Sequence, residues 1–233
     1  MRLLALVPAY NEEGNIEKLI GGIKAELPEA DILIINDCST DGTERILSST
    51  DGIRYLDLPF NMGIGGAVLS GFTYFLENGY DFLVRLDGDG QHPPSEAAKL
   101  VAAVSEDGVD AVIGSRYLID DAEYSSKTRM LGIKFLDRLS GVILGKRFTD
   151  NTSGFRAFRR GTVEYLVKDY PSDYPEPEEI YLLTRGGFEI KEVPVNMLSR
   201  EAGVSSIGAF STYYFLVKVL LTISVKYMIG GKN

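Results

Sequence analysis

Short apolar runs alternate with amphipathic segments along the first half of the chain. Leu3 to Val7 is a continuous apolar run of strand length, and Asn15 to Leu27 carries apolar residues at the spacing of one helix face. Further strand-like runs lie at 31–35, 53–58, 80–86 and 110–113, and further helical patterns end near Leu47 or span 67–76 and 95–104. Strands that alternate with helices are typical of an α/β domain with a largely parallel sheet. Thr40 or Asp41 is expected to cap the second helix and Ser95 the fourth.

This alternation ends after Tyr117. A helical pattern at 131–144, a helix over 178–185 and a strand over 188–195 follow, and residues 207–229 form a largely apolar helix with a narrow polar stripe. Lys218 lies in the middle of that last helix, which argues against a membrane span. Three placements stay open for it: a membrane interface, the body of the protein, or a contact between subunits. We therefore expect one α/β domain over 1–206 and an amphipathic helix with a tail over 207–233.

Composition narrows the function classes. The net charge of −9 argues against nucleic acid as a partner. Cys38 is the only cysteine, so an intramolecular disulfide and a cysteine-rich zinc site are both excluded. The apolar run that follows Arg2 is too short for a signal peptide and lacks a cleavage site. These features predict a protein of the cytoplasm, and the apolar terminal helix adds the option of peripheral attachment to the inner face of the cell membrane.

Positive charge is concentrated in one segment. Residues 116–160 contain ten Lys or Arg against five Asp or Glu, a local net charge of +5 that leaves −14 for the remainder. A basic segment in an acidic protein indicates one focused anionic ligand, although a solvated helix face would show the same count.

Oxygen ligands gather directly after the run at 80–86. Asp87, Asp89 and Gln91 alternate with glycines, so an extended backbone presents three hard oxygen donors on one side. Such donors suit a divalent cation that keeps positions open for phosphate oxygens. The ends of strands in open α/β sheets are also where ligands bind. The alternative is a solvated acidic turn.

Seven sequence blocks, in order, resemble those of the family 2 glycosyltransferases, and among them the polyprenyl-phosphate sugar synthases. The most specific is Asp87 to Pro93, which is similar to the metal motif D-x-D-x-Q-H-P of that family. Asn36 to Gly42 is similar to the D-D-x-S-x-D-G block, with Asn36 in place of the first acid. The other blocks lie at 7–13, 61–65, 114–117, 150–156 and 192–206.

The resemblance implies a GT-A fold, an open mixed sheet with helices on both faces, and inverting transfer from a nucleoside-diphosphate sugar. It implies a divalent metal, Mg²⁺ or Mn²⁺, held by Asp89 and Gln91. The Q-x-x-R-W block of processive synthases and a multi-helix transmembrane extension are both absent from this sequence. The residues expected to bind the nucleotide are Pro8, Ala9, Tyr10, Glu12, Asp37, Asn61, Gly65, Asp87, Gly88 and Arg200.

Two kinds of acceptor group stay open, a hydroxyl and a phosphate. A sugar hydroxyl in a cell-envelope glycan would need a base, for which Asp150 is the candidate, with Glu178 behind it. A polyprenyl phosphate is already ionised and needs no base, and Arg116 and Arg129 would then hold its phosphate.

Several single residues have two interpretations. His92 braces the acidic loop or binds the metal, and Asp41 caps a helix or contacts the nucleotide. Tyr10 stacks on the nucleobase or packs in the protein, and Arg156 binds the acceptor or pairs with Asp150. A homo-oligomer stays open. A non-catalytic peripheral membrane protein is the rival to the enzyme.

Overall fold

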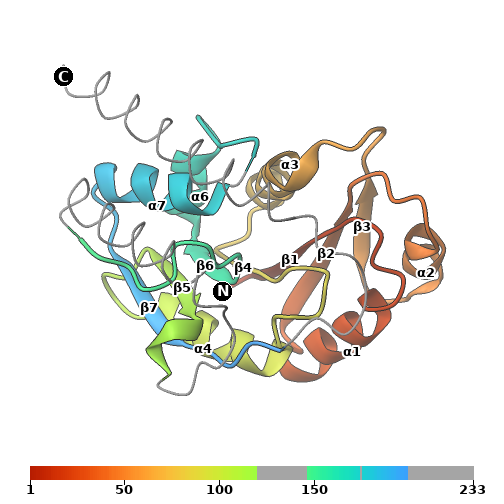
Figure 1. Ribbon diagram of the computed structural model, residues 1–233, viewed down its shortest axis with the longest axis horizontal. Coiled ribbons are helices and arrows are strands. Elements are labelled where there is room, and N and C mark those ends of the chain that lie inside the picture. Colours follow the sequence, from red (N-terminus) through yellow and green to blue (C-terminus); the bar gives the residue numbers. More distant parts are fainter. Residues whose placement is uncertain (120–145, 174, 199–233) are drawn as a thin grey trace, which may run out of the picture.

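Seven strands form one mixed sheet in the computed structural model, which describes residues 1–119, 146–173 and 175–198 (Figure 1). The strands are β1 (Leu3–Ala9), β2 (Ala30–Asn36), β3 (Arg54–Asp57), β4 (Phe82–Arg85), β5 (Ala111–Ser115), β6 (Arg156–Arg159) and β7 (Ile190–Pro194). Their order across the sheet is β3-β2-β1-β4-β6-β5-β7, and β6 runs antiparallel to both of its neighbours. The other pairs are parallel, so the ends of β1, β2 and β4 meet at one edge.

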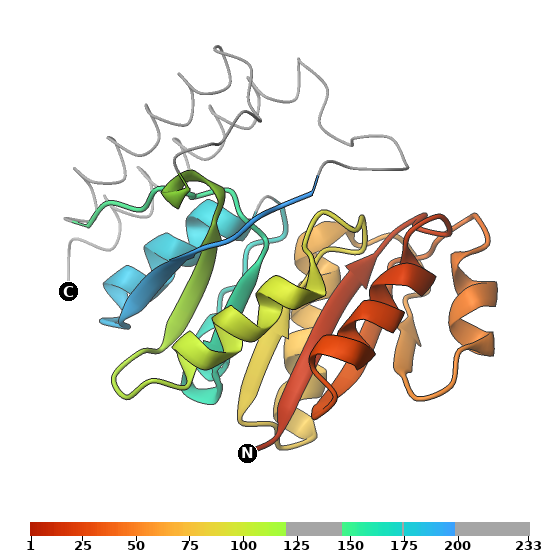
Figure 2. The same cartoon turned by 90° about the horizontal axis from the view of Figure 1, so that it is seen from below.

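Helices cover both faces of this sheet (Figures 1 and 2). One face carries α1 (Ile16–Glu26), α2 (Thr43–Ser49) and α4 (Pro94–Val104), and the other carries α3 (Gly63–Glu77), α6 (Arg160–Leu166) and α7 (Pro175–Arg185). A short 3-10 helix, η1 (Arg116–Leu118), follows β5.

Strand β1 supplies both hydrophobic cores. Ala5 and Val7 pack in the core on the α1 and α4 side, whereas Leu4 and Leu6 pack in the core on the α3 side. A central strand buried on both faces needs apolar residues at every position. This explains why the sequence shows an unbroken apolar run there instead of an alternation.

The predicted α/β class and mixed sheet are confirmed, with two local corrections. Ser95 does not cap α4, because that helix begins at Pro94 after Pro93, and a proline in the first turn loses no hydrogen bond. The sequence pattern also missed β6 and α6. Strand β6 has only four residues and an arginine at each end, which is too short and too polar for a periodicity signal.

Some predictions lie outside the described residues. These are Arg129, Arg200, the helix at 131–144 and the amphipathic helix at 207–229. Within the described part of the chain, no helix combines the length and the apolar character needed to cross a membrane.

Candidate active site

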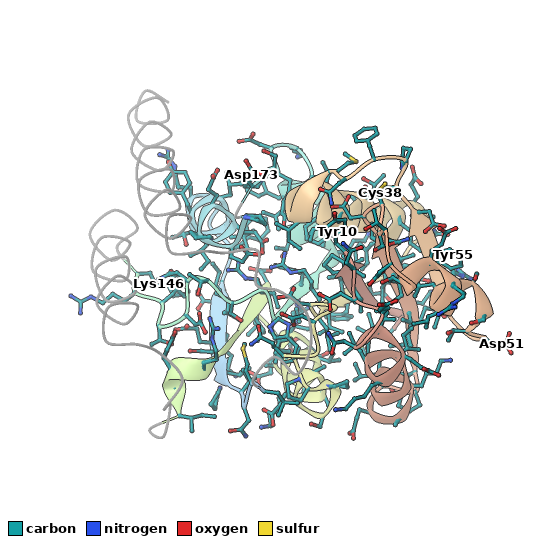
Figure 3. All side chains as sticks on the ribbon, turned by 45° about the vertical axis from the view of Figure 1, so that its right-hand side comes forward. Tyr10, Cys38, Asp51, Tyr55, Lys146 and Asp173 are labelled. Atoms are coloured by element: carbon teal, nitrogen blue, oxygen red, sulfur yellow. The ribbon has the colours of Figure 1, made fainter. Side chains whose placement is uncertain are left out.

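The loops after β1 and β2 form one hydrogen-bonded unit. The Asn11 N–H donates to Ser39 Oγ at 2.9 Å, and Asn11 Oδ1 accepts from the Thr40 N–H at 2.7 Å. Asn11 and Cys38 both have positive φ, 57° and 60°, which turns the two loops toward each other. Figure 3 shows Tyr10 and Cys38 on these loops, and the Tyr10 side chain is 47% exposed. The exposed ring of Tyr10 therefore lies at this edge, as its predicted stacking on a nucleobase requires.

Asp37 connects this unit to the start of α3. Its buried carboxylate accepts from the Met62 N–H at 2.7 Å, and the Asn61 side-chain amide donates to the Asp37 carbonyl at 3.2 Å. Asp37 and Asn61, both predicted to bind nucleotide, are therefore brought together. The structure gives Gly65 another role. Its N–H donates to the Ser172 carbonyl, and an added Cβ would lie 2.2 Å from that oxygen, so Gly65 permits close packing of α3 against this backbone.

Asp41 lies one residue before Gly42, the N-cap of α2, and its carboxylate binds the first residue of the helix. Its carboxylate accepts from the Thr43 N–H at 2.9 Å, from the Thr43 hydroxyl at 2.6 Å and from the Glu13 N–H at 3.1 Å. Burial alone would raise its pKa, but these hydrogen bonds outweigh it and lower the pKa. Glu12 is held by the same turn, since its N–H donates to Thr43 Oγ1 at 2.9 Å. The helix-cap interpretation of Asp41 therefore fits the contacts.

The loop after β4 lies directly against β1. The Gly88 N–H donates to the Pro8 carbonyl at 3.2 Å, and an added Cβ on Gly88 would lie 3.0 Å from that oxygen and 3.3 Å from the Ala9 Cβ. Only glycine fits here without a shift of the β1 loop. Pro8, Ala9 and Gly88, all predicted to bind the nucleotide, are thus brought together at the strand ends, where all three are buried.

His92 braces the acidic loop. Its Nδ1 accepts from the Asp87 N–H at 2.9 Å, which leaves the proton on Nε2, 3.7 Å from Asp87 Oδ2. The ring is buried and stacks on Phe155 with centroids 4.7 Å apart. Burial lowers the pKa of His92 despite the neighbouring Asp87 and Asp89, so the ring is neutral. Because both ring nitrogens face Asp87, the brace is the interpretation that fits.

Asp87, Asp89 and Gln91 fit a divalent cation by their donor chemistry. The Asp87 side chain is 35% exposed, and Asp89 Oδ1 accepts from the Gln91 N–H at 3.0 Å. The Gln91 amide nitrogen donates to the Leu198 carbonyl at 3.3 Å, which leaves the amide oxygen as the ligand atom. In the described residues no three His, Cys, Asp or Glu side chains cluster for a metal, so the candidate ligands are two carboxylates and the amide oxygen of Gln91.

Asp150 and Arg116 form a buried ion pair. Arg116 Nε lies 2.8 Å from Asp150 Oδ2 and Nη2 lies 2.9 Å from Oδ1, while Asp150 is 0% exposed. Burial alone would raise the pKa of Asp150, but the hydrogen bonds and charge of Arg116 outweigh it and lower that pKa. The Arg116 side chain remains 25% exposed, and Asp150 fixes the orientation of its guanidinium.

Glu192 fixes the backbone that carries Asp150. Its carboxylate accepts from the Thr149 N–H at 2.9 Å, from the Thr149 hydroxyl at 2.9 Å and from the Asp150 N–H at 3.0 Å. Of the two interpretations of Arg156, pairing with Asp150 is wrong. Arg156 instead donates to Glu179 Oε1 at 2.9 Å, because the β6 register turns its side chain toward α7.

Gly154 contacts the acidic loop, a role that no sequence signal revealed. An added Cβ would lie 2.7 Å and 2.8 Å from the two carboxylate oxygens of Asp87. We expect Gly154→Ala to displace Asp87 and to lower kcat/KM for the reaction of this site about 10- to 100-fold. Gly161→Ala is the matched control, since nothing lies within 4 Å of its added Cβ. Equal activity of both variants in steady-state kinetics would contradict a role of this contact in positioning Asp87.

Comparison with known proteins identifies the family. The sequence profile described as Glycosyl transferase family 2 matches residues 5–166. The chain belongs to this family. It is therefore a glycosyltransferase, and the predicted enzyme class is confirmed.

Curated relatives and solved structures refine this assignment. The family 2 chain is 33% identical over 227 residues to the polyprenol monophosphomannose synthase of Mycolicibacterium smegmatis, covering 94% of this chain and 85% of the relative. It is 32% identical over 216 residues to the undecaprenyl-phosphate mannosyltransferase of Micrococcus luteus, covering 89% and 88%. These matches confirm the resemblance to polyprenyl-phosphate sugar synthases.

The fold is shared with glucosyl-3-phosphoglycerate synthase from Mycobacterium tuberculosis, solved with Mn²⁺, UDP and phosphoglyceric acid. The TM-score is 0.71 at 20% identity, covering 95% of this chain and 78% of the other. With the family assignment, this confirms the predicted GT-A fold.

Proposed function

We propose that this glycosyltransferase moves a sugar from a nucleoside-diphosphate sugar to the phosphate of a polyprenyl phosphate. The observation that carries the proposal is the Arg116–Asp150 pair. Both carboxylate oxygens of Asp150 accept from Arg116, and its pKa is lowered. Such a carboxylate is a poor base for a hydroxyl acceptor. A phosphate needs no base, and a guanidinium fixed by Asp150 is suited to bind its oxygens.

The names of the relatives support a lipid phosphate as the acceptor, but they do not agree on the sugar that is transferred. Two are named for mannose, whereas a relative from Methanococcus voltae, 26% identical, is named for N-acetylglucosamine transfer to dolichyl phosphate. The common part of these names is the polyprenyl-type phosphate. A lipid acceptor also supports peripheral contact with the inner face of the cell membrane. A homo-oligomer stays a prediction.

The donor half is proposed at the strand ends of β1, β2 and β4. Tyr10, Asp37 and Asn61 would bind the nucleoside, and the backbone of Pro8, Ala9 and Gly88 would shape the floor beneath it. Asp89 and Gln91, with Asp87 beside them, would hold Mg²⁺ or Mn²⁺. When bound, such an ion supplies positive charge to the departing nucleoside diphosphate.

The acceptor half is proposed on the other side of Asp87. Thr152 Oγ1 accepts from Arg116 Nη2 at 3.1 Å, so Asp150 and Thr152 together aim the guanidinium. Arg116 would hold the phosphate, with Arg129 as a second cation and Arg200 at the donor diphosphate. An oriented phosphate oxygen can then attack the sugar from the face opposite the leaving group, which inverts the anomeric carbon.

A thermal-shift panel of UDP, GDP, dTDP and CDP, each with Mn²⁺, tests the donor assignment. A nucleotide at 100 times its dissociation constant stabilises the native state by about 2.7 kcal/mol, which is a shift of several degrees. We expect one base to give the largest shift and to name the donor. The control is Asp37→Asn, which should reduce the shift. The absence of any shift with all four nucleotides would contradict the donor site.

A further inference from the structure

Two arginines are buried side by side beneath the active-site loops. Arg85 ends β4 and Arg156 begins β6, and the antiparallel register places them directly opposite each other. Their side chains are 0% and 1% exposed. Like charges in this position repel each other, and the repulsion is stronger in a low-dielectric interior. The pair therefore requires a buried counter-charge.

Glu179 on α7 supplies that charge to both arginines. Its Oε1 accepts from Arg156 Nη1 at 2.9 Å and its Oε2 lies 3.3 Å from Arg85 Nη1. The Tyr170 hydroxyl donates to the same Oε2 at 2.7 Å. Glu176 adds a longer contact, 3.4 Å from Arg85 Nη2. Because Glu179 uses both oxygens, it orients the two guanidinium groups together.

The Nε donors of the two arginines hold consecutive carbonyls of one loop. Arg156 Nε donates to the Ser153 carbonyl at 2.9 Å, and Arg85 Nε donates to the Gly154 carbonyl at 2.7 Å. The loop from Asp150 to Phe155 thus rests on a buried ionic platform, which we define as Arg85, Arg156 and Glu179.

The same loop touches both halves of the active site. At its start Asp150 pairs with Arg116, and near its end Gly154 lies against the carboxylate of Asp87. A shift of the Ser153 and Gly154 carbonyls would therefore move Asp87 and Arg116 relative to each other. No side chain of the ionic platform has to touch a substrate for this effect.

We propose that Glu179 is a positioning residue that sets the geometry between Asp87 and Arg116 by fixing Arg85 and Arg156 under the loop. The mechanistic meaning of this inference rests on the proposed function. The contacts on which the inference is based are independent of that function.

Hydrogen exchange of wild type and Glu179→Gln tests the proposal without any substrate. Glutamine keeps the shape of the side chain and removes the charge that orients both guanidinium groups. We expect amides of 150–155 to exchange at least about 10-fold faster, with β1 and β2 unchanged. The matched control is Glu164→Gln, which removes an exposed ion pair with Arg160 on α6 and should change nothing.

Kinetics then separate positioning from simple support of the fold. In folded Glu179→Gln we expect kcat to fall at least about 10-fold, while the KM for the donor changes less than threefold. If Glu179→Gln exchanges its amides at 150–155 as slowly as wild type, or has the kcat of wild type, the proposal is overturned. If wild type transfers no sugar to polyprenyl phosphate, the proposed function fails, and the exchange experiment still decides the role of Glu179.

A double variant covers the case in which Glu179→Gln does not fold. Arg85→Met combined with Glu179→Met removes one buried charge of each sign, a replacement that folded proteins often tolerate. It also removes the hydrogen bond from Arg85 to Gly154. We expect a folded protein with fast exchange at 150–155 and low kcat. A folded double variant with full activity, or failure of both variants to fold, would overturn positioning as the role of Glu179.

Discussion

Asp89→Asn is expected to lower kcat/KM for sugar transfer at least about 1,000-fold, the largest effect that the site predicts. Asparagine keeps an oxygen for the Gln91 N–H, so the turn that Asp89 forms is retained. The variant loses the negative charge that would hold the divalent cation. Without that cation, charge on the leaving diphosphate develops in an acidic protein whose net charge is −9.

The measurement is steady-state transfer at saturating Mn²⁺, together with a melting curve. Asp107→Asn is the matched control, because Asp107 is an exposed acid in the turn between α4 and β5. We expect its kinetics to equal those of wild type. Retained Mn²⁺-dependent transfer in Asp89→Asn would remove Asp89 from the metal site.

Arg116→Met is expected to lower kcat/KM for the lipid phosphate at least about 100-fold, with the KM for the donor within about threefold of wild type. The change removes the guanidinium proposed to bind the acceptor. It also leaves the buried Asp150 carboxylate without its partner, which costs about 3–5 kcal/mol of stability. The loss of activity alone would therefore not identify the role of Arg116.

Combining Arg116→Met with Asp150→Asn separates the two effects. The double variant has no unpaired buried charge, so its melting temperature should lie above that of Arg116→Met while transfer stays low. If the double variant recovers transfer, the acceptor role of Arg116 is contradicted.

The pH dependence of stability has a definite sign for this pair. In wild type the pKa of Asp150 is lowered, so its contribution is present above about pH 4 and is lost as pH falls through the folded pKa. In Arg116→Met the unpaired carboxyl has a raised pKa. Its destabilisation is then largest at neutral pH and is relieved as pH falls.

The candidate donor-side residues could be located from the sequence because their signals are local. The apolar runs of β1 and β4 place Pro8 and Asp87 at strand ends, and Asp87, Asp89 and Gln91 lie within five residues of chain. The predicted extended backbone is wrong, however, because Gly88 and Asp89 form a turn and Gly90 has φ 75°.

The acceptor side depends on partners that are distant in sequence. The count of basic residues over 116–160 located positive charge, but it could not show that Arg116 pairs with Asp150, 34 residues away. It also could not show that Arg156 turns inward to Glu179. Arginines at the ends of a short strand normally indicate exposure, and their burial follows only from the insertion of β6 between β4 and β5.

Gly65 has a packing role that the sequence did not show. It was predicted to bind the nucleotide, and the structure adds that it permits contact of α3 with the backbone of Ser172. Gly154 lies in a stretch without regular structure, where only tertiary packing shows that a side chain would collide with Asp87.

Transfer to a polyprenyl phosphate, compared with the polyprenol of the same chain length, tests the central claim most directly. The purified protein would be incubated in detergent with Mn²⁺ and a labelled sugar donor of the base found in the thermal-shift panel. The account predicts label in the phosphorylated lipid and none in the alcohol. Equal labelling of the alcohol, or labelling of a glycan hydroxyl in place of the lipid phosphate, would contradict it.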